Sequence, residues 1–411
     1  MSFKSLGISK PIIKALTEKS YKSPTDIQVE AIPAILNKKD VLATAQTGTG
    51  KTASFVLPIL ERLSNSKAAK ANNVRALILV PTRELAAQVA AEIDSYSTHL
   101  ALRSNVVFGG VKINPQMIKL CKGSDLLVAT PGRLLDLYQK NTIKFSQLET
   151  LVLDEADRML DMGFASDISK IINLLPEQRQ NLMFSATFPE QLKVLAETIV
   201  NNPVTISINP EETTAVTVNE WLCPVDEKRK SALFVNLFKT NNWTQVLVFC
   251  MTKQGANALI RYLEKKKIKA SAIHGDKSQG ARTRALAEFK QGKIQVLVAT
   301  DLAARGLDIE QLPQVVNYDL PHINEDYIHR IGRTGRAGVP GEAISLVCAN
   351  EFKKLSEIER LIKRLISRKV IKDFEPKTGL PESKLDTRPI KPKKPKKPKK
   401  PKPLKNTKPG E

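Results

Sequence analysis

Short apolar runs alternate with helical patterns over most of the chain. Four of these runs have the length of a buried strand: VRALILV (74–80), DLLVAT (125–130), QVLVFC (245–250) and IQVLVAT (294–300). In the helical pattern after the third run, Leu259, Ile260 and Leu263 share one face. Thr252, just before that segment, is a suitable N-cap. Apolar strands separated by helices indicate parallel sheets that are covered by helices on both faces.

A five-residue pattern occurs twice, as LLVAT at 126–130 and as VLVAT at 296–300. A chain of 411 residues is also too long for one ordinary domain. These two features predict a pair of similar α/β domains in tandem, over 30–208 and 216–370. The polar segment NPEETTA, 209–215, is the predicted linker between them.

The C-terminal part of the chain has a different composition. Helical patterning fades after about Arg368, and the last 22 residues, from Ile390, hold ten lysines and one glutamate. A segment such as KPKKPKKPKKPKP cannot bury a core, so we predict a disordered basic tail over 371–411. Ten lysines less one glutamate give this tail nine of the 22 net positive charges of the chain. Such an excess predicts a polyanionic partner, either nucleic acid or an acidic membrane.

Cysteine and histidine spacing argues against a disulfide framework and against a zinc site. The four cysteines lie far apart and form no CxxC pair: Cys121, Cys223, Cys250 and Cys348. The four histidines have no metal-ligand spacing either. The N-terminus lacks the apolar run of a signal peptide, and nowhere do ~18 apolar residues run together. We therefore expect a cytoplasmic protein with reduced thiols and no membrane association.

The segment DVLATAQTGTGKT, 40–52, predicts a phosphate site. It places a strand before a glycine-rich turn and a helix, where backbone N–H groups point at phosphate oxygens. In this pattern Lys51 reaches the β- and γ-phosphates, and the Thr52 hydroxyl binds Mg²⁺. The general pattern begins with glycine, whereas this chain has Ala45. The alternative is a flexible turn before a helix, which G-K-T in this context disfavours.

Three carboxylates follow the apolar start of LVLDEADRML, 151–160. Without a cation or a catalytic role, Asp154, Glu155 and Asp157 would repel one another and lose hydration. Beside a phosphate site, Asp154 is expected to lie near Mg²⁺ through a water, and Glu155 to accept a proton from the attacking water. Asp157 is expected to bind other motifs. An acidic helix N-terminus is the alternative, but it does not explain the buried strand.

Six motifs in one order carry a family resemblance: PTREL (81–85), TPGR (130–133), DEAD (154–157), SAT (185–187), ARGLD (304–308) and HRIGRTGR (329–336). Over about residues 1–370 the chain resembles the DEAD-box RNA helicases of superfamily 2. The segments MSFKSLG, VVFGGVKINPQM and HGDKSQGARTRAL further resemble the bacterial RhlE-type branch. The resemblance implies two RecA-like domains, preceded by a Q-motif region over 1–29, with ATP and RNA bound between them.

The resemblance implies a role for each motif residue at the ATP site. Gln28 would read the adenine edge, and Asp308 would bind the ribose hydroxyls. Phe3 and Tyr21 match aromatics that cover the base, although Ser20 stands where the family has glycine. The nucleotide contacts implied in all are Phe3, Tyr21, Thr25, Gln28, Ala45, Gln46, Thr47, Gly48, Thr49, Gly50, Lys51, Thr52 and Asp308. The residues implied in catalysis are Lys51, Thr52, Asp154, Glu155, Ser185, Thr187, Arg333 and Arg336, the last two as arginine fingers.

RNA contacts are implied in both domains. They are Pro81, Thr82, Arg83, Gly110, Thr130 and Arg133 in the first, and Gly275, Gln279, Arg282 and Thr300 in the second. Most are small or backbone-directed groups, so we expect contacts to phosphate and 2′-hydroxyl without sequence readout. Taken singly, TPGR fits a helix start, GG fits a turn, and the arginines of 329–336 fit a solvated basic face. The complete ordered set favours the RNA interpretation.

These features predict an ATP-dependent RNA helicase that hydrolyses the β–γ anhydride under RNA stimulation and locally unwinds short duplexes. We expect a monomer that acts in ribosome assembly or RNA turnover, with ribosomal particles or RNA-decay assemblies as partners. The rivals are an RNA clamp without unwinding and a DNA helicase. A clamp would not need Glu155, whereas only the resemblance separates RNA from DNA.

The tail has its own hypothesis. Its prolines at 392, 395, 398 and 401 recur every third residue, the period of polyproline II. We favour a sequence-independent RNA tether, with a solubility tail and a nuclear-import signal as alternatives.

Overall fold

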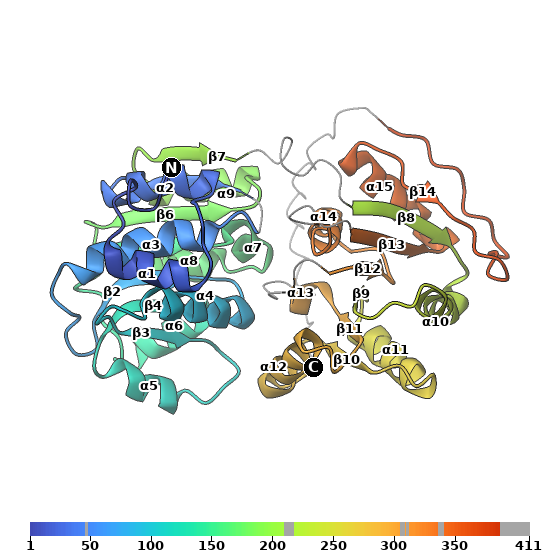
Figure 1. The fold of residues 1–411 in the computed structure, drawn as a ribbon, viewed down its shortest axis with the longest axis horizontal. Coiled ribbons are helices and arrows are strands. Elements are labelled where there is room, and N and C mark those ends of the chain that lie inside the picture. Colours follow the sequence, from blue (N-terminus) through green and yellow to red (C-terminus); the bar gives the residue numbers. More distant parts are fainter. Residues whose placement is uncertain (46–47, 209–217, 305–308, 310–311, 336–340, 387–411) are drawn as a thin grey trace, which may run out of the picture.

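The computed structural model describes residues 1–45, 48–208, 218–304, 309, 312–335 and 341–386. These residues form two parallel seven-stranded sheets with helices on both faces, side by side (Figure 1). This architecture confirms the predicted pair of parallel-sheet domains. The predicted linker, 209–215, lies outside the described residues. Below, domain one is residues 1–208 and domain two is residues 218–386.

Domain one contains, in sheet order, β3 (Ser104–Val107), β4 (Ser124–Ala129), β2 (Val74–Leu79), β5 (Thr150–Leu153), β6 (Gln180–Ser185), β1 (Val41–Thr44) and β7 (Val204–Ser207). Its helices are α1 (Lys10–Glu18), α2 (Asp26–Leu36), α3 (Lys51–Ser64), α4 (Arg83–Tyr96), α5 (Asn114–Leu120), α6 (Pro131–Gln139), α7 (Ala156–Asp161), α8 (Ala165–Ile172) and α9 (Glu190–Ile199).

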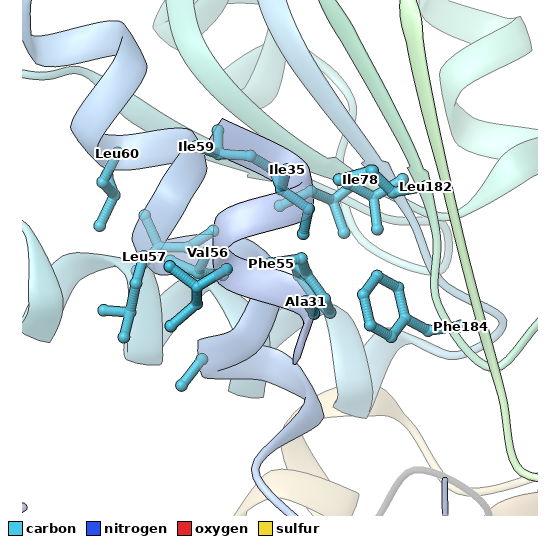
Figure 2. Close-up of a cluster of buried hydrophobic side chains, with 14 of the residues drawn as sticks. Ala31, Ile35, Phe55, Val56, Leu57, Ile59, Leu60, Ile78, Leu182 and Phe184 are labelled. Carbon is cyan, nitrogen blue, oxygen red and sulfur yellow. The ribbon is translucent and has the colours of Figure 1, made fainter. Parts of the chain in front are cut away.

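Two hydrophobic layers explain why the strands of domain one lack polar alternation. Helices α1 to α4 pack on one face of the sheet, and helices α5 to α9 pack on the other. Figure 2 shows the first layer, where Phe55 of α3 lies against Phe184 of β6 with ring centroids 5.0 Å apart. Neighbouring residues of β2 face opposite layers, Ile78 the first and Leu77 the second. Both faces of the inner strands β2, β4, β5 and β6 are therefore buried, as an apolar run requires.

Domain two contains, in sheet order, β10 (Ala270–Ile273), β11 (Val296–Ala299), β9 (Val246–Phe249), β12 (Gln314–Asn317), β13 (Gly341–Val347), β8 (Val218–Pro224) and β14 (Ser367–Arg368). Its helices are η1 (Glu227–Arg229), α10 (Lys230–Thr240), α11 (Lys253–Lys265), α12 (Gln279–Lys290), α13 (Asp301–Ala304), α14 (Glu325–Ile331), η2 (Ala349–Glu351) and α15 (Phe352–Ile362). No helix among the described residues is long and apolar enough to cross a membrane.

The two sheets have the same topology, strand for strand. In each sheet the first strand along the domain lies second from one edge, and the later strands follow in the same order. The repeated segments LLVAT and VLVAT fall on β4 and β11, which occupy equivalent places. The short repeat therefore marks a true structural equivalence between the domains.

Local predictions for helix α11 are confirmed. The Thr252 hydroxyl accepts a hydrogen bond from Gly255 N at 3.0 Å and so caps the helix. Leu259 and Leu263 are buried, and Ile260 packs at the edge of the same core. The cap and the apolar face together fix where this helix starts and which side meets the sheet.

The predicted start of the disordered tail at residue 371 is wrong. Residues 371–386 follow β14 along domain two, where Ile371, Phe374 and Leu380 pack on its hydrophobic cores. Polar contacts hold the same segment: the backbone N–H of Lys377 donates to Asp226, and Arg360 pairs with Asp386 at 3.4 Å. Three widely spaced apolar residues gave no helical or strand periodicity in the sequence. The Lys/Pro-rich part, from 387, lies outside the described residues.

Candidate active site

The glycine-rich turn of domain one joins β1 to α3. Gly48 and Gly50 have φ angles of +85° and +92°, in the left-handed region that favours glycine. A Cβ atom on Gly50 would lie 2.4 Å from Gln28 Nε2, so the turn and α2 approach too closely for a side chain. Gln46 and Thr47 lie outside the described residues. The turn delivers the N-terminus of α3, which begins at Lys51, toward the carboxyl ends of the strands.

Lys51 fits an anion at this turn. Its side chain is only 7% exposed, and its Nζ has no hydrogen-bond partner among the described residues. A buried ammonium group without a partner is unfavourable, and phosphate oxygens would supply what it lacks. The Gly50 N-cap and the unpartnered Lys51 therefore favour the predicted phosphate site over a simple flexible turn.

Gln28 is fully buried and bonded to the protein. Its Oε1 accepts from Thr25 N at 3.0 Å, and its Nε2 donates to Gly50 O at 3.1 Å. The Thr25 hydroxyl donates to Thr49 O at 2.8 Å. These bonds connect the start of α2 to the glycine-rich turn. A carboxamide has four hydrogen-bonding sites, so the predicted adenine contact would use those that remain, and it stays a prediction.

The two aromatic residues predicted to cover the base differ in exposure. Phe3 is 6% exposed and lies in the hydrophobic core beside α1 to α4. Tyr21 is 37% exposed, and its hydroxyl lies 3.0 Å from the hydroxyl of Tyr96. Tyr21 is therefore the better placed of the two to present a ring face to a base.

The acidic segment follows β5, as the sequence predicts. Burial raises the pKa of Asp154 to about 7, although the charge of Lys51 opposes the shift. Glu155 is held at φ +52°, a strained conformation for a residue with a side chain. A hard cation beside Asp154 would offset the cost of its buried charge.

Mg²⁺ is the cation that this donor set fits. Thr52 and Asp154 both offer oxygen, the ligand type that Mg²⁺ prefers. Among the described residues no group of three or more His, Cys, Asp or Glu side chains could hold a metal. Mg²⁺ here would therefore depend on phosphate oxygens and water for the rest of its ligands.

Asp157 connects the acidic segment to the SAT segment. Its Oδ2 accepts from Thr187 N at 3.0 Å and from the Thr187 hydroxyl at 2.8 Å, while the Ser185 hydroxyl donates to Thr187 O at 2.7 Å. Burial would raise the pKa of Asp157, but the hydrogen bonds from Thr187 and Ser185, together with the charge of Arg158, hold it below its ordinary value. Asp157 thus binds another motif, as expected, and remains ionised.

Domain two completes the site. A cavity of about 30 Å³ is lined by Glu155 and Asp157 of domain one and by His329, Arg330 and Arg333 of domain two. Its volume suits one or two water molecules. Burial lowers the pKa of His329 to about 3, so the imidazole is neutral here. Arg333 and Glu155 therefore line one cavity, as a shared site requires, while Arg336 and Asp308 lie outside the described residues.

The residues predicted to bind RNA gather at the carboxyl ends of both sheets. Thr82 caps α4 by accepting from Leu85 N at 3.2 Å, and Arg83 extends over Gly110. Gly110 has a φ of +74°, which favours glycine, and a Cβ there would displace the guanidinium of Arg83, 1.9 Å away. Arg133 donates to Val111 O at 3.0 Å. Thr130 and Thr300 occupy equivalent places after β4 and β11, and Gly275 follows β10.

Two contacts across the domain boundary were not foreseen from the sequence. Glu84 of domain one accepts from Gln279 Nε2 at 2.9 Å and pairs with Arg282 Nη2 at 3.1 Å. Arg158 of α7 pairs with Asp326 of α14 at 2.7 Å. Arg158 directly follows DEAD and Asp326 lies three residues before His329. The sequence shows that Arg158 and Asp326 lie beside motifs, but it does not show that the two residues contact each other.

Family models and solved structures agree on the relationship. The DEAD/DEAH box helicase model matches residues 25–195, and the helicase conserved C-terminal domain model matches residues 229–338. The chain is 42% identical over 361 residues to the DEAD-box ATP-dependent RNA helicase RhpA of Helicobacter pylori, covering 88% of this chain and 72% of that one. It is 40% identical over 367 residues to the DEAD-box ATP-dependent RNA helicase CshA of Geobacillus kaustophilus, covering 89% and 78%.

A structure of S. cerevisiae Dbp5 bound to RNA and ADP BeF3 matches with a TM-score of 0.81 at 32% identity, covering 90% of this chain and 96% of that one. The match extends over both domains, so their relative placement is similar as well. These similarities do not separate branches of the family, and the RhlE-type assignment stays a prediction.

Proposed function

Since the chain belongs to the DEAD-box family of ATP-dependent RNA helicases, we propose that its two domains form one composite ATPase site whose closure on RNA separates short duplexes. The observation that carries this proposal is the shared cavity, which Glu155 lines from one domain and Arg333 from the other. Neither domain alone holds both a carboxylate base and the arginine opposite it.

Each residue has a defined part in the proposed reaction. Lys51 and the N-terminus of α3 bind the phosphates, and Gln28 and Tyr21 hold the base. Glu155 accepts the proton of the attacking water, and Arg333 and Arg336 stabilise negative charge on the transferred phosphoryl group. Asp157, Ser185 and Thr187 couple the acidic segment to the closure of the two domains. Mg²⁺, held by Thr52 and by Asp154 partly through water, supplies charge neutralisation when bound.

RNA is proposed to lie along the carboxyl ends of both sheets. The equivalent placement of Thr130 and Thr300 supports one continuous backbone path, because each domain would offer the same kind of contact. These groups are suited to phosphate and 2′-hydroxyl, so no sequence preference is expected. A strand that must follow two closing domains is bent, and bending it disrupts pairing with its complement.

We test this proposal with Glu155→Gln, which keeps the shape of the side chain but removes the base. ATP turnover should fall by roughly 10²-fold or more while ATP still binds. Near-normal turnover would remove Glu155 from the mechanism. Wild-type ATP turnover is also compared with RNA and with DNA of the same sequence, which distinguishes an RNA helicase from a DNA helicase. We expect stimulation by RNA.

The cellular role is proposed at the level of substrate class. Sequence-independent contacts and a net charge of +22 suit structured RNA in ribosomal particles or RNA-decay assemblies. We propose that the protein acts there as a cytoplasmic monomer. Crosslinking of bound RNA in cells would test this role, and recovery of neither ribosomal RNA nor decay intermediates would contradict it.

A further inference from the structure

Arg158 and Asp326 form a buried ion pair across the domain boundary. Arg158 Nη1 lies 2.7 Å from Asp326 Oδ1, and the two side chains are 9% and 6% exposed. Arg158 is on α7 of domain one and Asp326 is in the first turn of α14 of domain two. Separation of the domains would break this pair, and Arg158 would keep its longer contact of 3.8 Å to Asp161 within domain one. The 2.7 Å pair therefore forms only when the domains are together.

Each partner is rigidly connected to the reactive residues of its own domain. Arg158 lies three residues after Glu155, and between them Asp157 is bonded to Thr187. Asp326 lies in the first turn of α14, the helix that carries His329 and Arg330 and leads to Arg333. Arg330 donates to both carboxylate oxygens of Asp301 on α13, at 2.6 and 2.7 Å, and to Asn317 Oδ1 on β12 at 3.0 Å, and so holds α14 on domain two. Joining Arg158 to Asp326 thus fixes Glu155 relative to Arg333.

The second cross-domain contact differs in kind. It uses Gln279 and Arg282, which the proposed function assigns to RNA, so its strength depends on the RNA bound beside it. Neither Arg158 nor Asp326 is assigned to nucleotide or RNA. Their pair depends on closure itself.

We propose that Arg158 and Asp326 are positioning residues that latch the closed state and align Glu155 with Arg333. The inference rests on the proposed composite site. A buried charge that loses its partner is strongly unfavourable, so disrupting the latch penalises closure more than substrate binding. Both side chains line the same cavity as Glu155 and Arg333, and each is engaged by the other, so the latch acts on turnover by holding the two sides of that cavity together.

The test uses charge reversal in the full-length chain. Arg158→Asp and Asp326→Arg should each lower turnover at saturating ATP and RNA by on the order of 100-fold. The KM for ATP should change little, because Lys51 and Gln28 belong to domain one. The double reversal restores an opposite pair and should recover most of the turnover. Lys193→Asp, which reverses a charge in an exposed pair within domain one, is the matched control and should have no effect.

Closure is measured in the same variants by energy transfer between two dyes. One dye is placed on the exposed Cys121 and the other on Lys265→Cys, an exposed site on α11, while the remaining cysteines are buried. Wild type should close with RNA and a non-hydrolysable ATP analogue, and each single reversal should lower the closed fraction. Single reversals that fold, close and turn over like wild type would overturn the latch. So would a folded double reversal without recovery.

Two further variants keep the outcome clear. Arg158→Lys retains the charge and should keep most of the closed fraction, whereas Arg158→Met should lower that fraction. This comparison remains informative if the charge-reversal variants fold poorly. Loss of closure in Arg158→Lys equal to that in Arg158→Met would contradict a charge-based latch. Glu155→Gln separates the latch from the proposed function, because it should close normally without turning over. Normal turnover in Glu155→Gln would remove the proposed mechanism but leave the closure results intact.

Discussion

The two domains share one strand order but carry different chemistry at the same edge of the sheet. In domain one, β1 leads into the glycine-rich turn and Lys51, and β5 leads into Asp154 and Glu155. In domain two, the equivalent β8 leads into VDEKR, 225–229, which has no glycine, and the lysine that begins α10, Lys230, pairs with Glu351 at 2.7 Å.

The equivalent of β5 shows the same division. Strand β12 leads into Tyr318 and Asp319, and Asp319 accepts from Met251 N and lies 3.5 Å from the buried Lys230. The acid at this position in domain two is therefore used within its own domain. Domain two supplies Arg330 and Arg333 to the shared cavity, which it also lines with Asp301 and Asp326. Domain one thus carries the glycine-rich turn, Lys51 and Glu155, and domain two carries Arg333, which faces Glu155 in the shared cavity.

The largest test of this division removes the arginine from domain two. Arg333→Ala should lower RNA-stimulated ATP turnover by about 10³-fold or more, the effect typical of an arginine that stabilises phosphoryl transfer. ATP binding should persist, because Lys51 remains. Turnover and nucleotide affinity are measured in parallel, with Lys193→Asp as the control. Undiminished turnover would mean that domain one carries the reaction alone.

A second test uses the buried acid of domain one. The pKa of Asp154 is raised by burial to about 7, so the folded state without nucleotide binds this proton more tightly than the unfolded state. Between pH 4 and 7 the unfolded state loses the proton first, and the stability of the folded state therefore falls as the pH rises. The loss should amount to a few kcal/mol when the pH has passed 7.

Asp154→Asn should abolish that dependence, and domain one should then be more stable at pH 8 than in wild type. Urea unfolding from pH 5 to pH 8, without nucleotide, measures the effect. If the free energy of unfolding changes with pH equally in the variant and in wild type, the Asp154 carboxylate is not destabilised by burial and the prediction is wrong. Domain two serves as the internal reference, because its acid at the equivalent position lies beside Lys230.

A smaller effect is expected at the base of the nucleotide. Gln28→Ala removes the carboxamide that connects Thr25 and Gly50 and that is predicted to read adenine. Competition between ATP and GTP should show a narrower preference for ATP. Tyr21→Ala is the companion variant, since it should weaken both nucleotides alike. If Gln28→Ala prefers ATP over GTP as strongly as wild type does, Gln28 does not read adenine and serves only to connect Thr25 and Gly50.

The sequence predicted features that depend on neighbouring residues better than features that depend on distant ones. Local signals were sufficient for the cap at Thr252, for the turn before Lys51 and for the equivalence of Thr130 and Thr300. The packing of 371–386 was missed because Ile371, Phe374 and Leu380 bury their side chains without any periodicity. Pairing across the cleft was missed as well: Arg158 and Asp326 are 168 residues apart, and only the placement of the two domains brings them together.

The smallest effect belongs to the basic tail, which lies outside the two-domain comparison. Removing residues 389–411 should weaken RNA binding most at low salt and flatten its salt dependence, because counterion release falls with the number of lysines. Turnover at saturating RNA should hardly change, since the shared cavity is intact. RNA affinity across a salt series measures this, and identical affinity and slope in both forms would exclude the tether.

The division of chemistry between the domains is tested most directly by ATP turnover of domain one alone. Residues 1–208 hold both hydrophobic layers of the first sheet, the glycine-rich turn and Glu155. This fragment should bind ATP, which shows that it is folded, yet its turnover with saturating RNA should be nearly absent beside that of the full chain. Full RNA-stimulated turnover from the fragment would contradict the composite site.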